Sequence, residues 1–133
     1  MEARDNEEST PLHLASAFSD VEMASLFLDH GASVKPRDSE GSIALHTAAG
    51  FGKTEIVRVL IDAGSDCNAV DGSGNTPLHA SAGSGHIEVV RLLIEKGADM
   101  FAVNNEGFTP SGCARLFGHM EVEQFIEEKH FSE

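Results

Sequence analysis

Residues 76–97 read TPLHASAGSGHIEVVRLLIEKG and contain the signals for two short helices. Thr76 is a good N-cap residue, and Pro77 suits the first helical position, where a backbone N–H has no partner anyway. After a turn at Gly85, apolar residues at helical spacing indicate a second helix. Gly97 follows at the position where helices commonly end with a positive φ angle. The stretch therefore predicts a helix-turn-helix unit.

The same pattern recurs every 33 residues without a gap, and the 133-residue chain has room for four such units in one domain. We place the units at residues 5–37, 38–70, 71–103 and 104–133. The residues expected just before the first helix of each unit are Thr10, Ile43, Thr76 and Thr109, and those early in the second helix are Glu22, Glu55, Glu88 and Glu121. In the second unit the hydroxyl is missing, so we expect Ser42 to act as the cap one residue early.

Helices this short are unstable alone, so the units must pack against one another. The second helices are apolar most of the way round, which predicts that neighbouring units cover them on both sides. We expect the first and last units to act as polar caps. The signals are Glu8, where the next three units have glycine, and four glutamates in the last helix, Glu121, Glu123, Glu127 and Glu128.

These units resemble the ankyrin repeat, through TPLHLA at residues 10–15, TPLHAS at 76–81 and GHIEVVRLLI at 85–94. The resemblance covers essentially the whole chain. It implies an all-α ankyrin-repeat solenoid, in which helix-turn-helix units stack and β-hairpin-like fingers project between them. Residues 1–133 would form a single ankyrin-repeat domain.

The composition restricts the partners. The formal net charge of −13 argues against nucleic acid and against an anionic membrane, both of which would repel the chain, and favours a neutral or basic protein. No apolar run approaches the length of a membrane span or resembles a signal peptide. Two cysteines are too few for a disulfide framework, so we expect a cytoplasmic or nuclear protein, and the capped ends favour a monomer.

No group of residues predicts catalysis, and we expect no enzyme activity, cofactor or metal. His13, His46 and His79 lie one per unit, about 10 Å apart in a stack of helices, which is too far for one metal ion. The resemblance implies instead that their imidazoles hydrogen-bond to turn backbone. Cys67 and Cys113 belong to no nucleophile motif and are expected to be buried as small hydrophobic residues.

The resemblance also implies where a partner would bind, because ankyrin partners usually dock on the finger tips and on the concave side of the first helices. On the fingers these positions are Asn6, Glu7, Ser39, Glu40, Ser42, Ser73, Asn75, Asn105, Glu106 and Phe108. At the ends of the first helices they are Phe18, Phe51, Ser84 and Phe117. The three helix-end rings either anchor a partner or seal the core over the turn, whereas for Phe108, placed at a tip, we favour contact with a partner.

The function predicted is therefore a non-catalytic protein-binding module of the adaptor or inhibitor type. Two alternatives remain open: an engineered or consensus-like scaffold without a natural partner, and a stand-alone regulator that blocks an enzyme such as a kinase. A smaller hypothesis concerns Asn68. With Leu60, Asp66 and Cys67 it resembles the ankyrin site for asparaginyl hydroxylation, although most such asparagines only hydrogen-bond within a turn.

Overall fold

The computed structural model describes residues 10–18 and 20–132, with side chains to residue 129, and over these residues the chain is helical without strands. The first helices of the four units are α1 (Pro11–Ala17), α3 (Ala44–Gly50), α5 (Pro77–Gly83) and α7 (Pro110–Leu116). The second helices are α2 (Val21–Asp29), α4 (Thr54–Asp62), α6 (Ile87–Glu95) and α8 (Met120–Ser132). The helix-turn-helix pattern and its 33-residue phase are confirmed.

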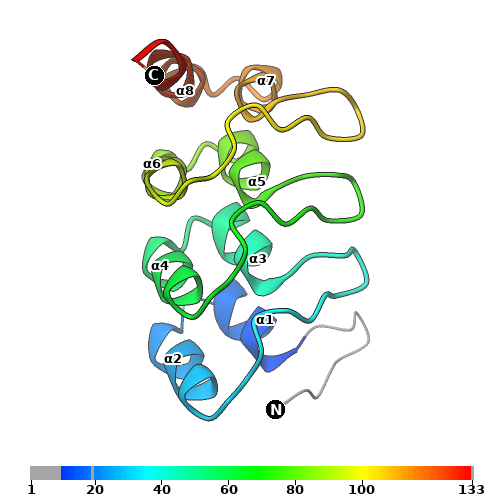
Figure 1. The fold of residues 1–133 in the computed structure, drawn as a ribbon, viewed down its shortest axis with the longest axis vertical. Helices are drawn as coiled ribbons and strands as arrows, with labels where there is room; N and C mark the ends of the chain where they lie inside the picture. Colours follow the sequence, from blue (N-terminus) through cyan, green and yellow to red (C-terminus); the bar gives the residue numbers. More distant parts are fainter. Residues whose placement is uncertain (1–9, 19, 133) are drawn as a thin grey trace.

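The helices form two stacked rows (Figure 1). The first helices lie in one row, the second helices in the other, and each helix packs against the next member of its row. The loops after α2, α4 and α6 return past the first helices and project as fingers on that side. The expected all-α solenoid with hairpin-like fingers is the observed architecture.

The core lies between the rows and between successive units. Leu45 and Leu78 from the first helices are fully buried, as are Ile56, Leu60 and Leu93 from the second helices. The prediction that neighbours cover the second helices therefore holds for the units at 38–70 and 71–103. Burying a leucine or isoleucine of this kind contributes about 1.5–3 kcal/mol, so stability depends on the stacking.

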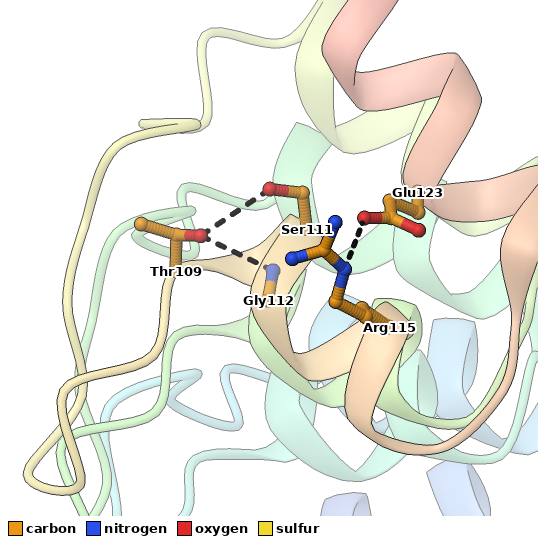
Figure 2. Close-up of polar contacts among 5 residues, drawn as sticks. All are labelled: Thr109, Ser111, Gly112, Arg115 and Glu123. Atoms are coloured by element: carbon orange, nitrogen blue, oxygen red, sulfur yellow. Dashed lines mark hydrogen bonds and ion pairs between the residues drawn. The ribbon is translucent and has the colours of Figure 1, made fainter.

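The caps of the first helices follow the sequence except in the second unit. The hydroxyls of Thr10 and Thr76 accept the backbone N–H three residues on, and Thr109 accepts that of Gly112 at 3.2 Å (Figure 2). The prediction for Ser42 was wrong. Ile43 is the N-cap residue of α3 and makes no side-chain cap, because its hydrocarbon side chain has no hydrogen-bond acceptor; it is buried in the core instead.

The ends of the second helices are also as predicted. Gly31, Gly64 and Gly97 have φ angles of 90°, 98° and 94°. Side chains rarely adopt this left-handed conformation, so glycine lets the chain leave the helix without strain and turn towards the next finger.

The two ends of the stack differ, which corrects the expectation of a polar cap at each. On α8, Glu121, Gln124 and Glu128 are exposed, as a terminal unit requires. On the first unit, in contrast, Leu14 and Met23 are exposed apolar side chains. Glu8, on which the N-terminal cap was predicted, lies outside the described residues.

Candidate functional site

Three buried histidines hold the fingers in place. The Nε2 atoms of His13, His46 and His79 lie 2.7, 2.9 and 2.8 Å from the backbone oxygens of Ser42, Asn75 and Phe108, each in the finger of the following unit. The predicted bond from imidazole to turn backbone is therefore present three times. The fourth unit has Gly112 at this position.

The protonation state of these rings follows from their partners. The backbone N–H groups of Thr10, Ile43 and Thr76 donate to Nδ1 of the histidine three residues on, so Nδ1 carries no proton and Nε2–H donates to the finger carbonyl. Burial lowers the pKa of His46 and His79 from the ordinary value of 6.5. Both nitrogens of each ring are thus engaged in structural bonds. Among the described residues, no group of three His, Cys, Asp or Glu side chains is arranged to hold a metal ion.

The fingers are tight turns that are bonded to one another. In the finger at 38–42, Oδ1 of Asp38 accepts the backbone N–H groups of Glu40 and Ser42 at 2.9 and 3.0 Å. The carbonyl of Glu40 accepts the N–H of Gly72 in the next finger at 2.9 Å. Gly41 has a φ of 79°, and a Cβ there would lie 2.8 Å from the Gly72 nitrogen, so only glycine allows this approach.

The predicted finger residues fall into two groups. Exposed on the fingers are Ser39, Glu40, Ser73, Asn105 and Glu106, and half-buried are Ser42, Asn75 and Phe108. The half-buried residues lie at the base of each finger, where their carbonyls accept the histidines. Asn6 and Glu7 lie outside the described residues.

Phe108 is not at a finger tip, which corrects its predicted place. It is the last finger residue before the Thr109 cap, and its backbone N–H donates to Oδ1 of Asn104 at 2.9 Å. A Cβ on Gly112 would lie 3.5 Å from the Phe108 ring, so the ring lies beside the helix position that carries histidine in the other units.

The rings at the ends of the first helices are exposed. Phe18, Phe51 and Phe117 retain 77%, 58% and 64% of their accessible surface, and Ser84 at the equivalent position is exposed too. Rings that sealed the core would have lost most of this surface. The structure therefore favours a free row of side chains over the core-sealing alternative.

A groove of about 390 Å³ opens between α5, α7 and the fourth finger. Its lining combines exposed apolar side chains with buried polar ones: Asn75, His79, Ala80, Gly83, Ser84, Asn104, Glu106, Phe108, Cys113, Leu116 and Phe117. We call this the groove pocket. It brings together five of the predicted partner residues, from two units, and leaves Phe18 and Phe51 on the earlier units.

Sequence reasoning missed Leu116, which is 56% exposed beside Phe117. The signal was present, because the equivalent positions in the other units are Ala17, Gly50 and Gly83. Gly83 lies beside the aromatic ring, since a Cβ there would be in ordinary van der Waals contact with the ring of Phe117 at 3.6 Å. Aligning the units by residue volume would have identified a large apolar residue where the others are small.

An ion pair secures the helix that carries these residues (Figure 2). Nε of Arg115 lies 3.0 Å from Oε2 of Glu123, with side-chain exposures of 76% and 13%. The pair joins α7 to α8. Because the arginine is largely exposed, we assign the pair a contribution to stability of under about 1 kcal/mol.

The two cysteines are not activated as nucleophiles. Burial raises the pKa of the Cys113 thiol, with a smaller contribution from Glu106, and burial also raises that of Cys67. Both cysteines are unpaired, Cys113 buried and Cys67 half-buried, and a protonated thiol is a poor nucleophile. Asn68 is exposed, and its Oδ1 accepts the backbone N–H of Asp99 in the next unit at 2.8 Å.

The fold and the groove pocket define a helical repeat solenoid with a free inner surface. A family model described as "Ankyrin repeats (many copies)" matches residues 12–61, 45–94 and 80–126. The chain therefore belongs to the ankyrin repeat family, whose members are generally non-catalytic modules for protein–protein interaction. A comparison with curated proteins gave no match. None of the helices in the described part of the chain is long and apolar enough to cross a membrane.

Proposed function

We propose that this chain is a non-catalytic recognition module that binds one protein partner through the groove pocket and the finger tips, as an adaptor or an inhibitor. The observation that carries the proposal is the exposed pair Leu116 and Phe117, which borders the groove pocket and contributes little to the core. Exposed large side chains at the edge of a concavity are typical anchors for a partner.

The acidic side chains on this surface favour a neutral or basic partner, as the composition of the chain predicts. Glu106 lines the groove pocket, and Glu40 lies on an earlier finger tip. A partner segment with an apolar side chain for the pocket and a basic residue for the fingers would suit this surface. The protein would act as a monomer in the cytoplasm or nucleus.

The test is affinity capture followed by titration of the captured protein. The Leu116→Ala/Phe117→Ala double variant should weaken binding by about 1–3 kcal/mol per side chain, or roughly 5- to 150-fold each. Its melting temperature should barely move. The matched control is Phe101→Ala, which removes another exposed phenylalanine outside the groove pocket and should bind like the wild type. Equal affinity of all three proteins would contradict the assigned surface.

The same affinity capture, with the same variants, distinguishes two alternative functions. A regulator that blocks an enzyme would inhibit the captured partner, and the groove variant would lose that inhibition. A scaffold without a natural partner would capture nothing from any lysate. The irregular second and fourth units, with Ile43 and Gly112 in place of the repeated threonine and histidine, favour a natural sequence over a designed one.

We also propose Asn68 as a hydroxylation site, as its resemblance to the modified ankyrin asparagines implies. Its exposed side chain supports this assignment. Mass spectrometry of protein from its native cells should find the peptide that contains Asn68 heavier by one oxygen atom. An unmodified peptide throughout would remove the idea.

A further inference from the structure

The outer face of the first unit is apolar and exposed. The name outer face is used here for the surface formed by Leu14, Phe18, Met23, Leu26 and Phe27. The first four of these side chains are exposed, and Phe27 is half-buried. All of them except Leu26 border, together with Pro11, Ala15 and Asp20, a hollow of about 240 Å³ that is open to solvent. In Figure 1, α1 and α2 are the outermost helices of the described residues at this end of the stack.

Two of these positions, those of Met23 and Phe27, are buried in every other unit. Met23 is 39% exposed, whereas its equivalents Ile56, Val89 and Val122 are 0%, 0% and 2% exposed. The equivalents of Phe27 are Leu60, Leu93 and Ile126, and all three are buried. These side chains lie on α4, α6 and α8, each of which packs against the second helix of the preceding unit. The outer face thus continues the interface that already joins one unit to the next.

The opposite end of the stack does not continue that interface. Val57 and Val90 are fully buried, but the equivalent residue of α8 is Glu123, which pairs with Arg115. Glu127 likewise replaces Ile61 and Ile94. A fifth unit after α8 would have to complete the burial of Glu127 and of the ion pair whose Arg115 is still 76% exposed, at a substantial cost. The face of α8 that points away from the stack therefore lacks the apolar residues that a following unit would cover, whereas the outer face has them.

We propose that the outer face is a stacking site that binds an ankyrin-type helix pair supplied from outside residues 1–133. The occupant presents the aliphatic face that α2, α4 and α6 present to the units that follow them. This proposal rests on the repeat register and not on the groove pocket, so it stands or falls separately from the proposed function.

Two other occupants fit less well. Residues 1–9 read MEARDNEES, with one large apolar residue, and are too few for a helix pair such as that from Pro11 to Asp29. A second copy has two faces to offer. Its α8 end is acidic, and its own outer face would bury only a few side chains, against roughly 20–30 residues a side in a stable interface. Such a symmetric pair would also form none of the histidine-to-finger bonds that join stacked units.

The experiment adds an ankyrin-type helix pair to the chain, in the 33-residue register of the existing units. Residues 71–103, placed directly before Asp5 in place of residues 1–4, give a chain in which an added unit faces α1 and α2 as the third unit faces the fourth. The added unit should raise the melting temperature by about 5 °C or more in a single transition, since each further kcal/mol moves the midpoint of a domain of this size by several degrees.

Met23→Glu is the matched variant in both chains. In the original chain it should move the melting temperature by less than about 2 °C, because Met23 is already exposed. In the extended chain it should remove most of the gain, since a carboxylate would then be buried without a partner. Glu22→Gln, an exposed neighbour on the same helix, should leave both chains unchanged.

Three results would overturn the proposal. The added unit could leave the melting temperature unchanged or melt separately, so that the outer face accepts no helix pair. Met23→Glu could destabilise the original chain as much as the extended one, so that the chain's own residues already cover the face. Sedimentation equilibrium could find a dimer that Met23→Glu dissociates, so that a second copy is the occupant.

Discussion

Mild acid should destabilise the fold through His46 and His79. Each ring accepts a backbone N–H at Nδ1 and donates from Nε2 to a finger carbonyl, so a second proton at Nδ1 would face a donor. Burial accordingly lowers the pKa of both side chains below 6.5. Between the folded and the unfolded pKa, the unfolded chain binds more protons. The free energy of unfolding therefore falls as the pH falls through about 6.5.

The size of the effect has an upper limit set by linkage. A histidine that takes up no proton in the folded state between about pH 7.5 and 5.5 lowers the free energy of unfolding by about 1.4 kcal/mol over that range. His46 and His79 together can contribute up to about 2.7 kcal/mol. Most aspartates and glutamates titrate near pH 4, so the window above about pH 5 isolates the histidines from the carboxylates.

Urea unfolding at a series of pH values would measure this slope. His46→Gln and His79→Gln place a neutral amide at each site, and each variant should lose up to about 1.4 kcal/mol of the pH dependence while being less stable at every pH. Leu78→Ala is the control, because it destabilises the core without adding or removing a titrating group. A His46→Gln/His79→Gln double variant that kept the wild-type slope would refute the reasoning.

Three further predictions concern the stack and its surface. Leu78→Ala should cost about 2–5 kcal/mol of unfolding free energy, because the side chain is fully buried, and urea unfolding would measure it. Gly74→Ala should cost more than Gly118→Ala in the same assay: both have a φ near 80°, but only at Gly74 would a Cβ lie 2.9 Å from a neighbouring backbone nitrogen, that of Asn105. Asn68→Ala should cost about 0.5–1.5 kcal/mol through the lost bond to the next unit, with faster amide exchange at Asp99 as its local signature.

The interior of the stack was predictable because every interior unit has the same surroundings. Thr76 and Pro77 predicted the start of a helix, and Gly64 and Gly97 predicted the ends of helices. These predictions held because caps and positive φ angles depend on the chemistry of neighbouring residues. Ile43 shows where such local signals stop being sufficient. The helix α3 begins after it without a side-chain cap, because the burial of Ile43 in the core compensates for the missing hydrogen bond.

The ends and the groove could not be predicted in the same way. Met23 and Ile56 occupy equivalent positions and are both apolar, yet among the described residues only Ile56 is covered by a preceding unit. An amphipathic pattern reports which face can be buried, and it carries no information on whether a neighbour is present. The place of Phe108 could not be predicted for a related reason, because its ring lies beside Gly112 of α7, a contact between residues that the repeat pattern does not specify.

Phe108 also shows how one residue serves both the scaffold and the groove pocket. Its carbonyl accepts Nε2–H of His79 and its N–H donates to Asn104, so its backbone fixes the fourth finger. Its ring lines the groove pocket and forms none of these bonds. A change to the ring therefore alters the surface offered to a partner while the bonds that hold the finger remain. Because the backbone carries the repeat, the side chains at the finger bases are free to differ from unit to unit, as Ser42, Asn75 and Phe108 do.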